Sequence, residues 1–390
     1  MIKLAVIGAG ARGWDLARQA MTLSRQVRVT AIVDPDAKAV RTRITADGGT
    51  PDGIAFYQDI DSFLGRANDC DGLIIASRCS THADLAARVA GLGKPLFLEK
   101  PVAITMEQLA ALRQAYQGRM DRVVVSFPLR LTPLFRAVLA VIATGRLGTI
   151  NQVQAFNNVP YGGVYFGHWY RDYSETGGLW LQKATHDFDY INLLIRQRPV
   201  MVAAVGTRAV YGGSRPCDLK CSQCPDTATC PESPVAHLRR GDTGGMASKP
   251  GGDHDCAFSD CIKHDDASSA LIVYENGVHA SYTQNFVSRR SAARRGAVVT
   301  GYHATLIFDW YGGAPQVIDH FEKRVEPIVV PPVVSGHAGG DEALLANFIN
   351  VIRKSEPSLS TLQDGMLSAA MCVAATESAA ARVFQPVGQW

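Results

Sequence analysis

Three glycines near the N-terminus have the spacing of a dinucleotide-binding turn. Residues 8–13 read GAGARG, a G-x-G-x-x-G pattern that follows an expected strand and opens an expected helix, as phosphate binding requires. Gly8 permits the tight turn, Gly10 lets the backbone approach a pyrophosphate, and Gly13 allows close packing of helix on strand. The helix N-terminus then attracts the phosphate charge. The alternative is a strand, turn and helix that bind no ligand.

An acidic residue follows the second expected strand. The carboxylate of Asp34 can accept a hydrogen bond from an adenosine ribose hydroxyl and would repel a 2′-phosphate. The sequence therefore favours NAD over NADP. Arg41 and Arg43 weaken this preference, because either side chain could bind a phosphate.

Cysteines gather in the middle of the chain and suggest metal chemistry. They follow a C-x3-C-x2-C-x5-C pattern made by Cys217, Cys221, Cys224 and Cys230. Further candidate ligands follow at Cys256, Cys261, His254 and His264. Four thiolates can hold a structural zinc ion and order a polar segment. Unliganded reduced thiols and disulfides are the alternatives. Radical iron–sulfur enzymes share the C-x3-C-x2-C spacing, but they carry it in a barrel fold.

The elements that carry the glycine run alternate regularly over residues 1–127. Strands are expected at 4–7, 27–33, 72–76, 95–98 and 122–126. Helices are expected at 12–23, 37–44, 60–64, 82–92 and 106–116. Strands that alternate with helices predict a doubly wound parallel sheet. This α/β region is the expected NAD-binding Rossmann domain.

The remainder, residues 128–390, is expected to form a substrate and oligomerisation domain with an open, mostly antiparallel sheet. Its strands are expected at 150–156, 200–209, 268–274, 278–285, 297–300 and 304–308. Asn276-Gly277 should supply the two positive-φ positions of a hairpin turn. Residues 211–265, rich in Cys, Gly, Asp and Pro, are expected to be an insertion. Helices at 341–352 and 361–382 are expected to return to the Rossmann domain.

Composition narrows the class of protein. The 390 residues are 47% hydrophobic and 19% charged, with a net charge of +3, which is too small to indicate nucleic-acid or membrane-surface binding. No apolar run reaches the roughly 20 residues that a membrane span needs. The first residues lead directly into an expected strand, with no targeting signal. We therefore expect a cytoplasmic protein whose cysteines are mostly reduced or metal-bound.

Several short motifs, taken together, resemble the Gfo/Idh/MocA oxidoreductases. They are THAD at 81–84, GKPLFLEKP at 93–101, FPLR at 127–130, GRLG at 145–148, and His337 with GGD at 339–341. The resemblance covers nearly the whole chain and implies a bound nicotinamide cofactor and homo-oligomers built through the C-terminal sheet. The cofactor-binding residues are expected to be Gly8, Gly10, Ala11, Arg12, Gly13, Asp34, Ser77, His82, Glu99 and Lys100.

The family's Glu-Lys-Pro lysine corresponds to Lys100. An ammonium at the carboxyl end of a strand can bond a substrate hydroxyl and favour the developing alkoxide, so the resemblance implies a catalytic role. It also implies a cis peptide bond before Pro101, which would fix the aim of the lysine. The alternative is a salt bridge between Glu99 and Lys100 at the strand end.

A second family motif is an aspartate four residues before a histidine. The histidine corresponds to His186, whereas Gln182 occupies the usual aspartate position. Residues four apart share a helix face, so both could line a pocket. Glutamine can bond a hydroxyl but cannot take its proton, so acid–base work is expected to fall on His186, with Lys183 or Lys100 as helpers. The alternative for His186 is a helix-capping or core histidine.

Aromatic and basic residues on either side of this motif are candidates for substrate recognition. Rings that could stack on a sugar face, and a neighbouring cation, are Tyr161, Trp169, Tyr170 and Arg171. A loop rich in arginine contains Arg289, Arg290, Arg294 and Arg295. This loop could recognise an anionic group, although a solvated loop or a subunit contact is the simpler interpretation for any one arginine.

The sequence thus predicts an NAD-dependent oxidoreductase that takes hydride from a carbinol of a small sugar or polyol. The alternative is an NAD-dependent glycosidase of the same fold, which oxidises the sugar transiently, eliminates the aglycone, adds water and returns the hydride. The glutamine and the arginine loop lean toward that alternative, on an acidic sugar such as a sulfoquinovoside. A non-catalytic cofactor-binding regulator is a third class, which the presence of Lys100 and His186 disfavours.

Overall fold

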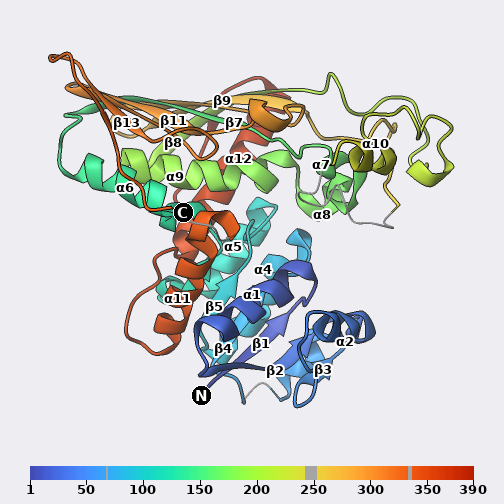
Figure 1. Cartoon of the computed structure of the whole chain (residues 1–390). Coiled ribbons are helices and arrows are strands. Elements are labelled where there is room, and N and C mark those ends of the chain that lie inside the picture. The colour runs from blue at the N-terminus through green and yellow to red at the C-terminus, as the bar shows by residue number, and fades with distance from the viewer. Residues whose placement is uncertain (67–68, 242–252, 333–335) are drawn as a thin grey trace. The chain divides into compact units, whose positions relative to one another are not determined.

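A computed structural model describes residues 1–66, 69–241, 253–332 and 336–390 (Figure 1). The chain divides into two compact units. The first comprises Met1–Arg136, Pro331–Ala370 and Gln389–Trp390, and the second comprises Ala137–Val330 and Met371–Gly388.

The first unit is built on a parallel sheet of six described strands in the order β3-β2-β1-β4-β5-β6. The strands are β1 (Ile2–Ile7), β2 (Val27–Val33), β3 (Ala55–Tyr57), β4 (Gly72–Ile75), β5 (Leu96–Leu98) and β6 (Val123–Val125). The doubly wound parallel sheet predicted from the sequence is confirmed. The strand β3 was missed because its three residues are exposed or only partly buried, unlike those of the equally short but fully buried β5 and β6.

Helices pack on both faces of this sheet, as the wound topology requires. They are α1 (Ala11–Leu23), α2 (Ala37–Ala46), α3 (Ile60–Leu64), α4 (His82–Val89), α5 (Met106–Ala115) and α11 (Gly340–Ile352). The last of these comes from the far end of the chain and packs against α1. Its residues Leu344, Leu345 and Phe348 are buried in the same core as β1 and α1. A Cβ at Gly72 would lie 2.6 Å from Cδ1 of Ile352, so this glycine lets the Ile352 side chain of α11 pack closely on β4.

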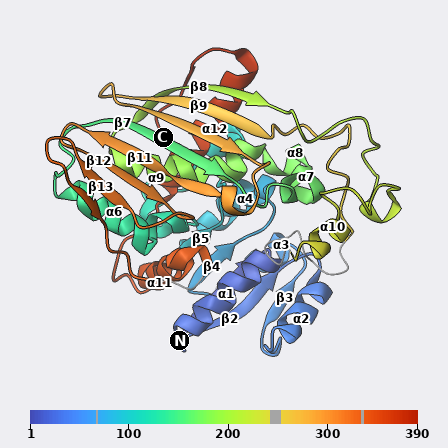
Figure 2. The same cartoon turned by 45° about the horizontal axis from the view of Figure 1, so that its top comes forward.

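The second unit contains a sheet of nine described strands in the order β14-β13-β12-β11-β7-β10-β9-β8-β15 (Figure 2). The strands are β7 (Ile150–Asn158), β8 (Pro199–Thr207), β9 (Ala267–Tyr274), β10 (His279–Asn285), β11 (Arg294–Gly301), β12 (Ala304–Asp309), β13 (Gln316–Asp319), β14 (Val325–Pro327) and β15 (Gln385–Pro386). Within the described residues the pairs are antiparallel except for β7 with β10. The open, mostly antiparallel sheet predicted from the sequence is confirmed.

The turn between β9 and β10 corrects one detail of that prediction. The amide of Gly277 donates to the carbonyl of Tyr274 at 2.9 Å. Gly277 has a φ of +85°, whereas Asn276 is not in the left-handed region. The loop is thus a turn closed by one left-handed glycine, because the pairing of Tyr274 with Val278 leaves three residues to connect the strands.

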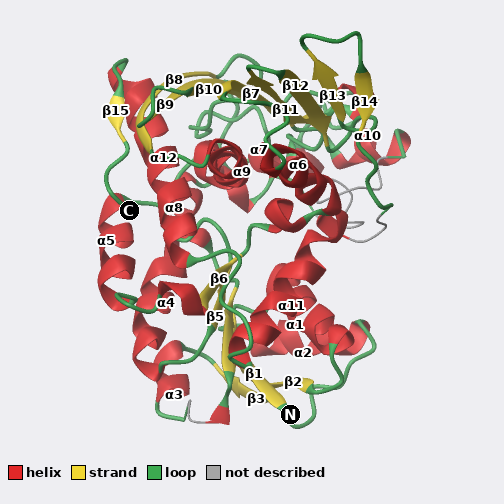
Figure 3. Ribbon diagram, turned by 90° about the vertical axis from the view of Figure 1, so that its left-hand side faces the viewer, coloured by secondary structure: helices red, strands yellow, loops and turns green. Residues whose placement is uncertain are grey.

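Helix α9 (Thr185–Ile195) covers one face of the second sheet and buries Phe188, Tyr190 and Ile191 (Figure 3). Exposed apolar side chains, among them Met201, Val205 and Leu271, lie on β8 and β9. Within the described residues no helix combines the length and apolar character that crossing a bilayer demands.

Candidate active site

The glycine run after β1 is shaped partly by packing and partly by open space. Gly8 has a φ of +81°, and a Cβ there would lie 2.7 Å from the backbone of Ser77. A Cβ on Gly13 would lie 2.0 Å from the Gly8 carbonyl oxygen. A Cβ on Gly10, by contrast, would meet no atom within 4 Å. Two glycines therefore close the turn, while the backbone at Gly10 is open to an approaching pyrophosphate at the start of α1.

The carboxylate after β2 is held in place by backbone amides. Asp34 accepts hydrogen bonds from Ala9 N and Asp36 N, each at 2.9 Å. Arg41 and Arg43, the two arginines that could have bound a 2′-phosphate, have contacts within the protein. Arg41 stacks 3.8 Å above the Phe56 ring, and Arg43 donates to the Ala9 carbonyl at 3.4 Å. The acidic group predicted to bond the ribose is therefore fixed beside the glycine turn.

Arg12 has a structural role that the sequence did not reveal. Its guanidinium lies 2.7 Å from Glu99 and 2.7 Å from Asp341, and it also bonds Ser126. Burial raises the pKa of Glu99, but the charges of Arg12 and Lys100, together with hydrogen bonds from Arg12 and Ser126, hold that pKa below its usual value. The Arg12 side chain is thus engaged within the protein. Any contact of this turn with a cofactor falls to the backbone.

The loop that carries Lys100 is fixed to its neighbour by a buried histidine. One ring nitrogen of His82 lies 2.8 Å from the Pro101 carbonyl oxygen and the other lies 3.2 Å from the Ser77 carbonyl oxygen. The peptide bond between Lys100 and Pro101 is cis, as the resemblance implied. The main partner of Glu99 is Arg12, although the Lys100 amide also donates to Glu99 at 3.2 Å. Ser77, His82, Glu99 and Lys100 are thereby brought together at the carboxyl ends of β4 and β5.

In the second unit, the segment after the glycine pair departs from the expected helix. Residues Trp180–Ala184 form a π-helix, and α9 begins only at Thr185. Gln182 lies in the π-helix and donates to the Thr176 carbonyl at 3.1 Å, whereas His186 lies in the first turn of α9. The four-residue spacing of Gln182 and His186 therefore crosses a junction between a π-helix and an α-helix, and a pocket lined by both side chains stays a prediction. π-Helical turns of this kind often occur at functional sites.

Lys183, in the π-helix, has the environment of an acid–base group. Its ammonium donates to the Tyr161 hydroxyl, and it lies 4.4 Å from the Tyr161 ring centroid and 5.5 Å from that of Tyr165. Burial lowers the pKa of Lys183 to about 7, with a further decrease from the positive charge of Arg295. A lysine in this state can exchange a proton at neutral pH.

A buried ion pair supplies the fixed charge beside Lys183. Arg295 Nε lies 2.8 Å from Asp187, and both side chains are almost fully buried. Asp187 also accepts hydrogen bonds from Asn157 and Tyr282, each at 2.8 Å. Sequence reasoning gave no role to Asp187 and grouped Arg295 with a surface loop. The sequence feature that could have indicated a role for Asp187 is its position directly after His186.

Two of the other three arginines of that loop already have carboxylate partners. Arg289 lies 2.8 Å from Glu232, and Arg294 lies 2.9 Å from Asp309. Their charges are therefore largely neutralised within the protein.

The aromatic rings of Trp169 and Tyr170 and the guanidinium of Arg171, all expected to bind a sugar, have different surroundings. Trp169 stacks on Tyr170 at 3.9 Å, and the Tyr170 ring lies 5.1 Å from that of Tyr165, beside Lys183. Arg171 instead donates to Ser259 Oγ at 2.7 Å and to the Cys217 carbonyl at 3.2 Å. The aromatic residues thus adjoin the lysine, whereas Arg171 is anchored in the cysteine-rich segment.

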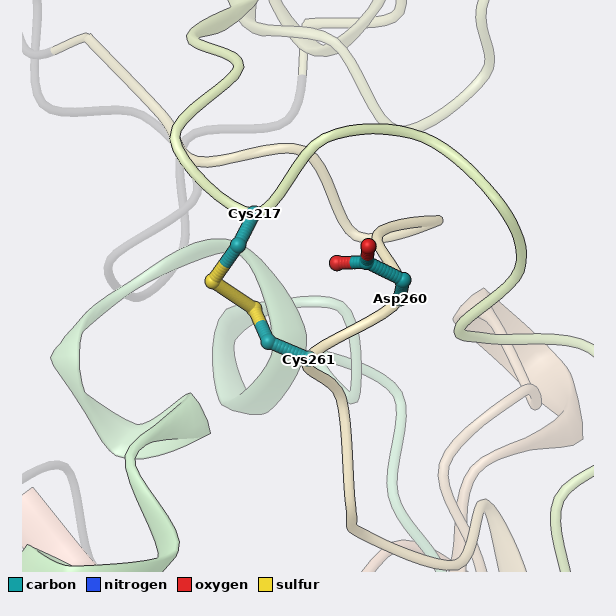
Figure 4. A group of neighbouring side chains, drawn as sticks. All are labelled: Cys217, Asp260 and Cys261. Carbon is teal, nitrogen blue, oxygen red and sulfur yellow. A yellow bond between two sulfur atoms is a disulfide. The ribbon is translucent and has the colours of Figure 1, made fainter.

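The expected zinc ligand set is corrected at one position. Cys217 forms a disulfide with Cys261, with 5.4 Å between their Cα atoms and Asp260 close by (Figure 4). A disulfide sulfur carries no thiolate, so Cys217 cannot ligate a metal in this state. Cys221, Cys224 and Cys230 carry no disulfide. Residues 242–252 of the expected insertion lie outside the described part of the chain.

Comparison with known protein families accounts for both units. Residues 2–127 match the model described as the oxidoreductase family, NAD-binding Rossmann fold. Residues 140–388 match the model described as the oxidoreductase family, C-terminal alpha/beta domain.

The sequence identity to the following individual relatives is below 30%. The putative oxidoreductase YteT of Bacillus subtilis is 25% identical over 358 residues, which cover 83% of this chain and 82% of that protein. An inositol 2-dehydrogenase of Rhizobium meliloti is 28% identical over 204 residues, 52% of this chain and 58% of that one. A structure of levoglucosan dehydrogenase with NADH and L-sorbose has a TM-score of 0.77 at 18% identity, over 100% of this chain and 99% of that one. This last likeness concerns the fold.

Proposed function

Because the chain belongs to the Gfo/Idh/MocA oxidoreductase family, we propose that it is an NAD-dependent dehydrogenase that oxidises a carbinol of a sugar or polyol. The observation that carries this proposal is the buried Lys183, which bonds the Tyr161 hydroxyl and has a pKa of about 7. A carbinol must lose a proton as its hydride leaves, so the reaction needs such a group. Relatives named for inositol and levoglucosan support this substrate class.

The first unit fits the nicotinamide dinucleotide. The open backbone at Gly10 would face the pyrophosphate, and the carboxylate of Asp34 would bond the adenosine ribose. When bound, NAD supplies the hydride acceptor. Lys100, at the carboxyl end of β5, is proposed to bond the substrate oxygen and favour its alkoxide form.

The second unit supplies the proton-transfer groups. Neutral Lys183 accepts the hydroxyl proton, with the Tyr161 hydroxyl as the hydrogen-bonded partner that relays it. Arg295 stays charged because Asp187 pairs with it, so it continues to favour the neutral form of Lys183. His186 is proposed as a second proton-exchanging group, and Gln182 as a hydrogen-bonding residue for a substrate hydroxyl.

Trp169 and Tyr170 are proposed to contact the apolar face of a sugar ring, since stacked rings offer a flat surface beside Lys183. Arg171 is not included, because its guanidinium is used by Ser259 and the Cys217 carbonyl.

A transient-oxidation glycosidase remains the competing reaction on the same groups. Its acidic-sugar version depended on the arginine loop, where Arg289 and Arg294 are paired with Glu232 and Asp309. Because Arg289, Arg294 and Arg295 are paired with carboxylates, net dehydrogenation of a neutral polyol is the better-supported reaction.

One assay separates the two reactions. The purified protein is incubated with NAD and either free sugars and polyols or p-nitrophenyl glycosides, while NADH and nitrophenol are followed separately. NADH formation with a free polyol supports the proposal. Nitrophenol release without net NADH would replace it with the glycosidase, and NAD binding without either product would indicate a non-catalytic regulator. The Lys183→Met variant is the control for enzyme-dependent turnover.

We also propose a homo-oligomer through the second sheet. Met201, Val205 and Leu271 are exposed apolar side chains on adjacent strands β8 and β9, and contact with a second copy would remove them from water. Light scattering of the wild type and of Leu271→Arg tests this proposal. A monomeric wild type would contradict it.

A further inference from the structure

Four free thiols surround one cavity in the second unit. Cys221, Cys224, Cys230 and Cys256 line a cavity of about 200 Å³. The first three belong to the predicted cysteine pattern. Cys256 lies beyond residues 242–252 in the sequence and takes the place that the sequence had given to Cys217.

The backbone explains how Cys256 comes to the other three. The amide of Cys221 donates to the His254 carbonyl at 2.8 Å, and that of Cys256 donates to the Leu219 carbonyl at 2.9 Å. These two bonds flank a β-bridge between Lys220 and Asp255. The pairing puts Cys221 and Cys256 on neighbouring segments of the same cavity.

Tight turns bring in the remaining two thiols. The Cys224 amide donates to the Cys221 carbonyl at 3.3 Å, and the Cys230 amide donates to the Asp226 carbonyl at 2.8 Å. Arg215 Nη1 lies 3.5 Å from Cys224 Sγ. A cation at this position would compensate the negative charge of a set of thiolates and orient one of them.

The ligand atoms of another group, Cys217, Asp260 and Cys261, lie closer together than the four thiols do, but this group lacks suitable ligands. Ligand atoms of Cys217, Asp260 and Cys261 lie within 4.8 Å of one another. The two sulfurs are bonded to each other, which leaves one exposed carboxylate. The four-thiol cavity is therefore the better metal site, because none of its four sulfurs is bonded in a disulfide.

We propose that Cys221, Cys224, Cys230 and Cys256 hold one metal centre through four thiolates. A zinc ion and an iron–sulfur cluster both use this ligand chemistry. Four protein thiolates leave no position for substrate, so the centre is structural. In the described part of the segment, the helices are the 3-10 turn Cys221–Gln223 and α10 (Pro234–Arg239), and metal binding supplies the order that a small core cannot.

The metal centre also stabilises the neighbourhood of Lys183. Ala257, next to Cys256, is buried in a cluster with Tyr165 and Phe166, and the Tyr165 ring lies 5.5 Å from the Lys183 ammonium. The Asp255 amide donates to the Gly167 carbonyl at 2.9 Å. Loss of the metal is therefore expected to loosen α7 (Val164–Gly167) and the aromatic residues beside Lys183, with no effect on NAD binding by the first unit.

The test is metal analysis of full-length protein purified under nitrogen without added metal. We expect about one zinc per chain, or iron with acid-labile sulfide and visible absorbance. Either result supports the centre, and the two results distinguish its kinds. Cys256→Ser and Cys230→Ser should lose most of the metal. Cys217→Ser should keep it, and Cys372→Ser controls for the removal of a buried thiol elsewhere in the unit.

Wild-type protein alone can overturn the proposal, so it stays testable if a ligand variant fails to fold. A folded, metal-free preparation with all four thiols open to alkylation would contradict it. Disulfides among these four cysteines, found by mass spectrometry, would also contradict it, as would full metal content in Cys256→Ser. Because these readouts do not depend on turnover, they stand apart from the proposed dehydrogenase activity.

Discussion

The ammonium of Lys183 donates a hydrogen bond to the Tyr161 hydroxyl and lies 4.4 Å from the centroid of the same ring. Burial and the neighbouring Arg295 lower the pKa of Lys183 to about 7, so both protonation states are populated at neutral pH. An ordinary surface lysine would remain charged and could not act as a base. This pair is therefore the best-supported acid–base device of the second unit.

Replacement of Lys183 should remove this device. Lys183→Met is expected to lower turnover by about 10²-fold or more, the usual size of a general acid–base contribution. If the neutral amine is the base, wild-type turnover rises as pH increases through about 7. The variant should lose that rise. Steady-state kinetics across pH, with Tyr161→Phe for comparison, measures both effects, and an unchanged pH profile in Lys183→Met would rule out the lysine.

The same variant should fold well, which separates catalysis from stability. Unfolded lysine stays protonated to about pH 10, whereas folded Lys183 releases its proton near 7, so folding between these values releases a proton. The free energy of unfolding therefore rises with pH over that window. Below pH 7 the wild type bears the full cost of a buried charge. Lys183→Met should then be at least as stable as the wild type there, with the difference shrinking at higher pH, as thermal unfolding would show.

Asp34 should set the choice of dinucleotide. Its carboxylate is held by the amides of Ala9 and Asp36 and would repel a 2′-phosphate. We expect the wild type to bind NAD more tightly than NADP. In Asp34→Ala the difference between the two affinities should be smaller. Calorimetry with both dinucleotides measures this. Tighter binding of NADP by the wild type would refute the assignment.

Much of the fold could be predicted because its signals are local. The strand Val27–Val33 and the helix Ile60–Leu64 begin and end where periodicity and turn residues put them. The glycine turn could also be predicted, since Gly8 and Gly13 leave no room for a Cβ and Gly10 leaves the backbone open. Short strands such as β3 and β15 depend on pairing with a neighbour and carry no pattern of their own.

The candidate site was only partly predictable, because its key contacts join distant parts of the chain. A π-helix inserts one residue into the helical hydrogen-bond pattern and no residue type indicates it, so the π-helical turn that contains Gln182 could not be predicted. The partnership of Cys256 with Cys221 depends on a bridge between segments separated by residues 242–252. Sequence spacing alone therefore selected Cys217.

Arg12 should matter for stability more than for cofactor contact. Arg12→Ala removes the guanidinium that joins the buried Glu99 and Asp341 and leaves Asp341 with His337 alone, and removal of one partner of a buried pair costs about 3–5 kcal/mol. Arg18→Ala is the matched control, because the Arg18–Asp15 pair is exposed and should contribute less than about 1 kcal/mol. Denaturant unfolding compares the two variants. If both variants lost the same small amount of unfolding free energy, the Arg12 cluster would not be a structural anchor.

Lys100 should act on turnover without affecting the fold or NAD affinity. Loss of one transition-state hydrogen-bond donor lowers the rate by a factor on the order of 10²–10³, so the turnover of Lys100→Ala is expected to fall by such a factor. Its position beside the cis peptide bond and the His82 bond to Pro101 keeps the loop in place without the side chain. Retained turnover in a variant that binds NAD normally would reduce Lys100 to an electrostatic neighbour of Glu99.

His186 tests whether proton transfer needs one group or two. It is buried in the first turn of α9, three residues after Lys183, while Gln182 cannot ionise. If His186 exchanges the proton itself, His186→Ala should lose at least about 10²-fold in turnover, and Gln182→Asp should restore part of that loss by offering a carboxylate. If Lys183 is the base, His186→Ala should keep the rise in turnover near pH 7 and lose mainly substrate affinity. The double variant with Lys183→Met decides between them. Effects that multiply would indicate two separate contributions, whereas a double variant no worse than Lys183→Met would show that both residues serve one proton-transfer step.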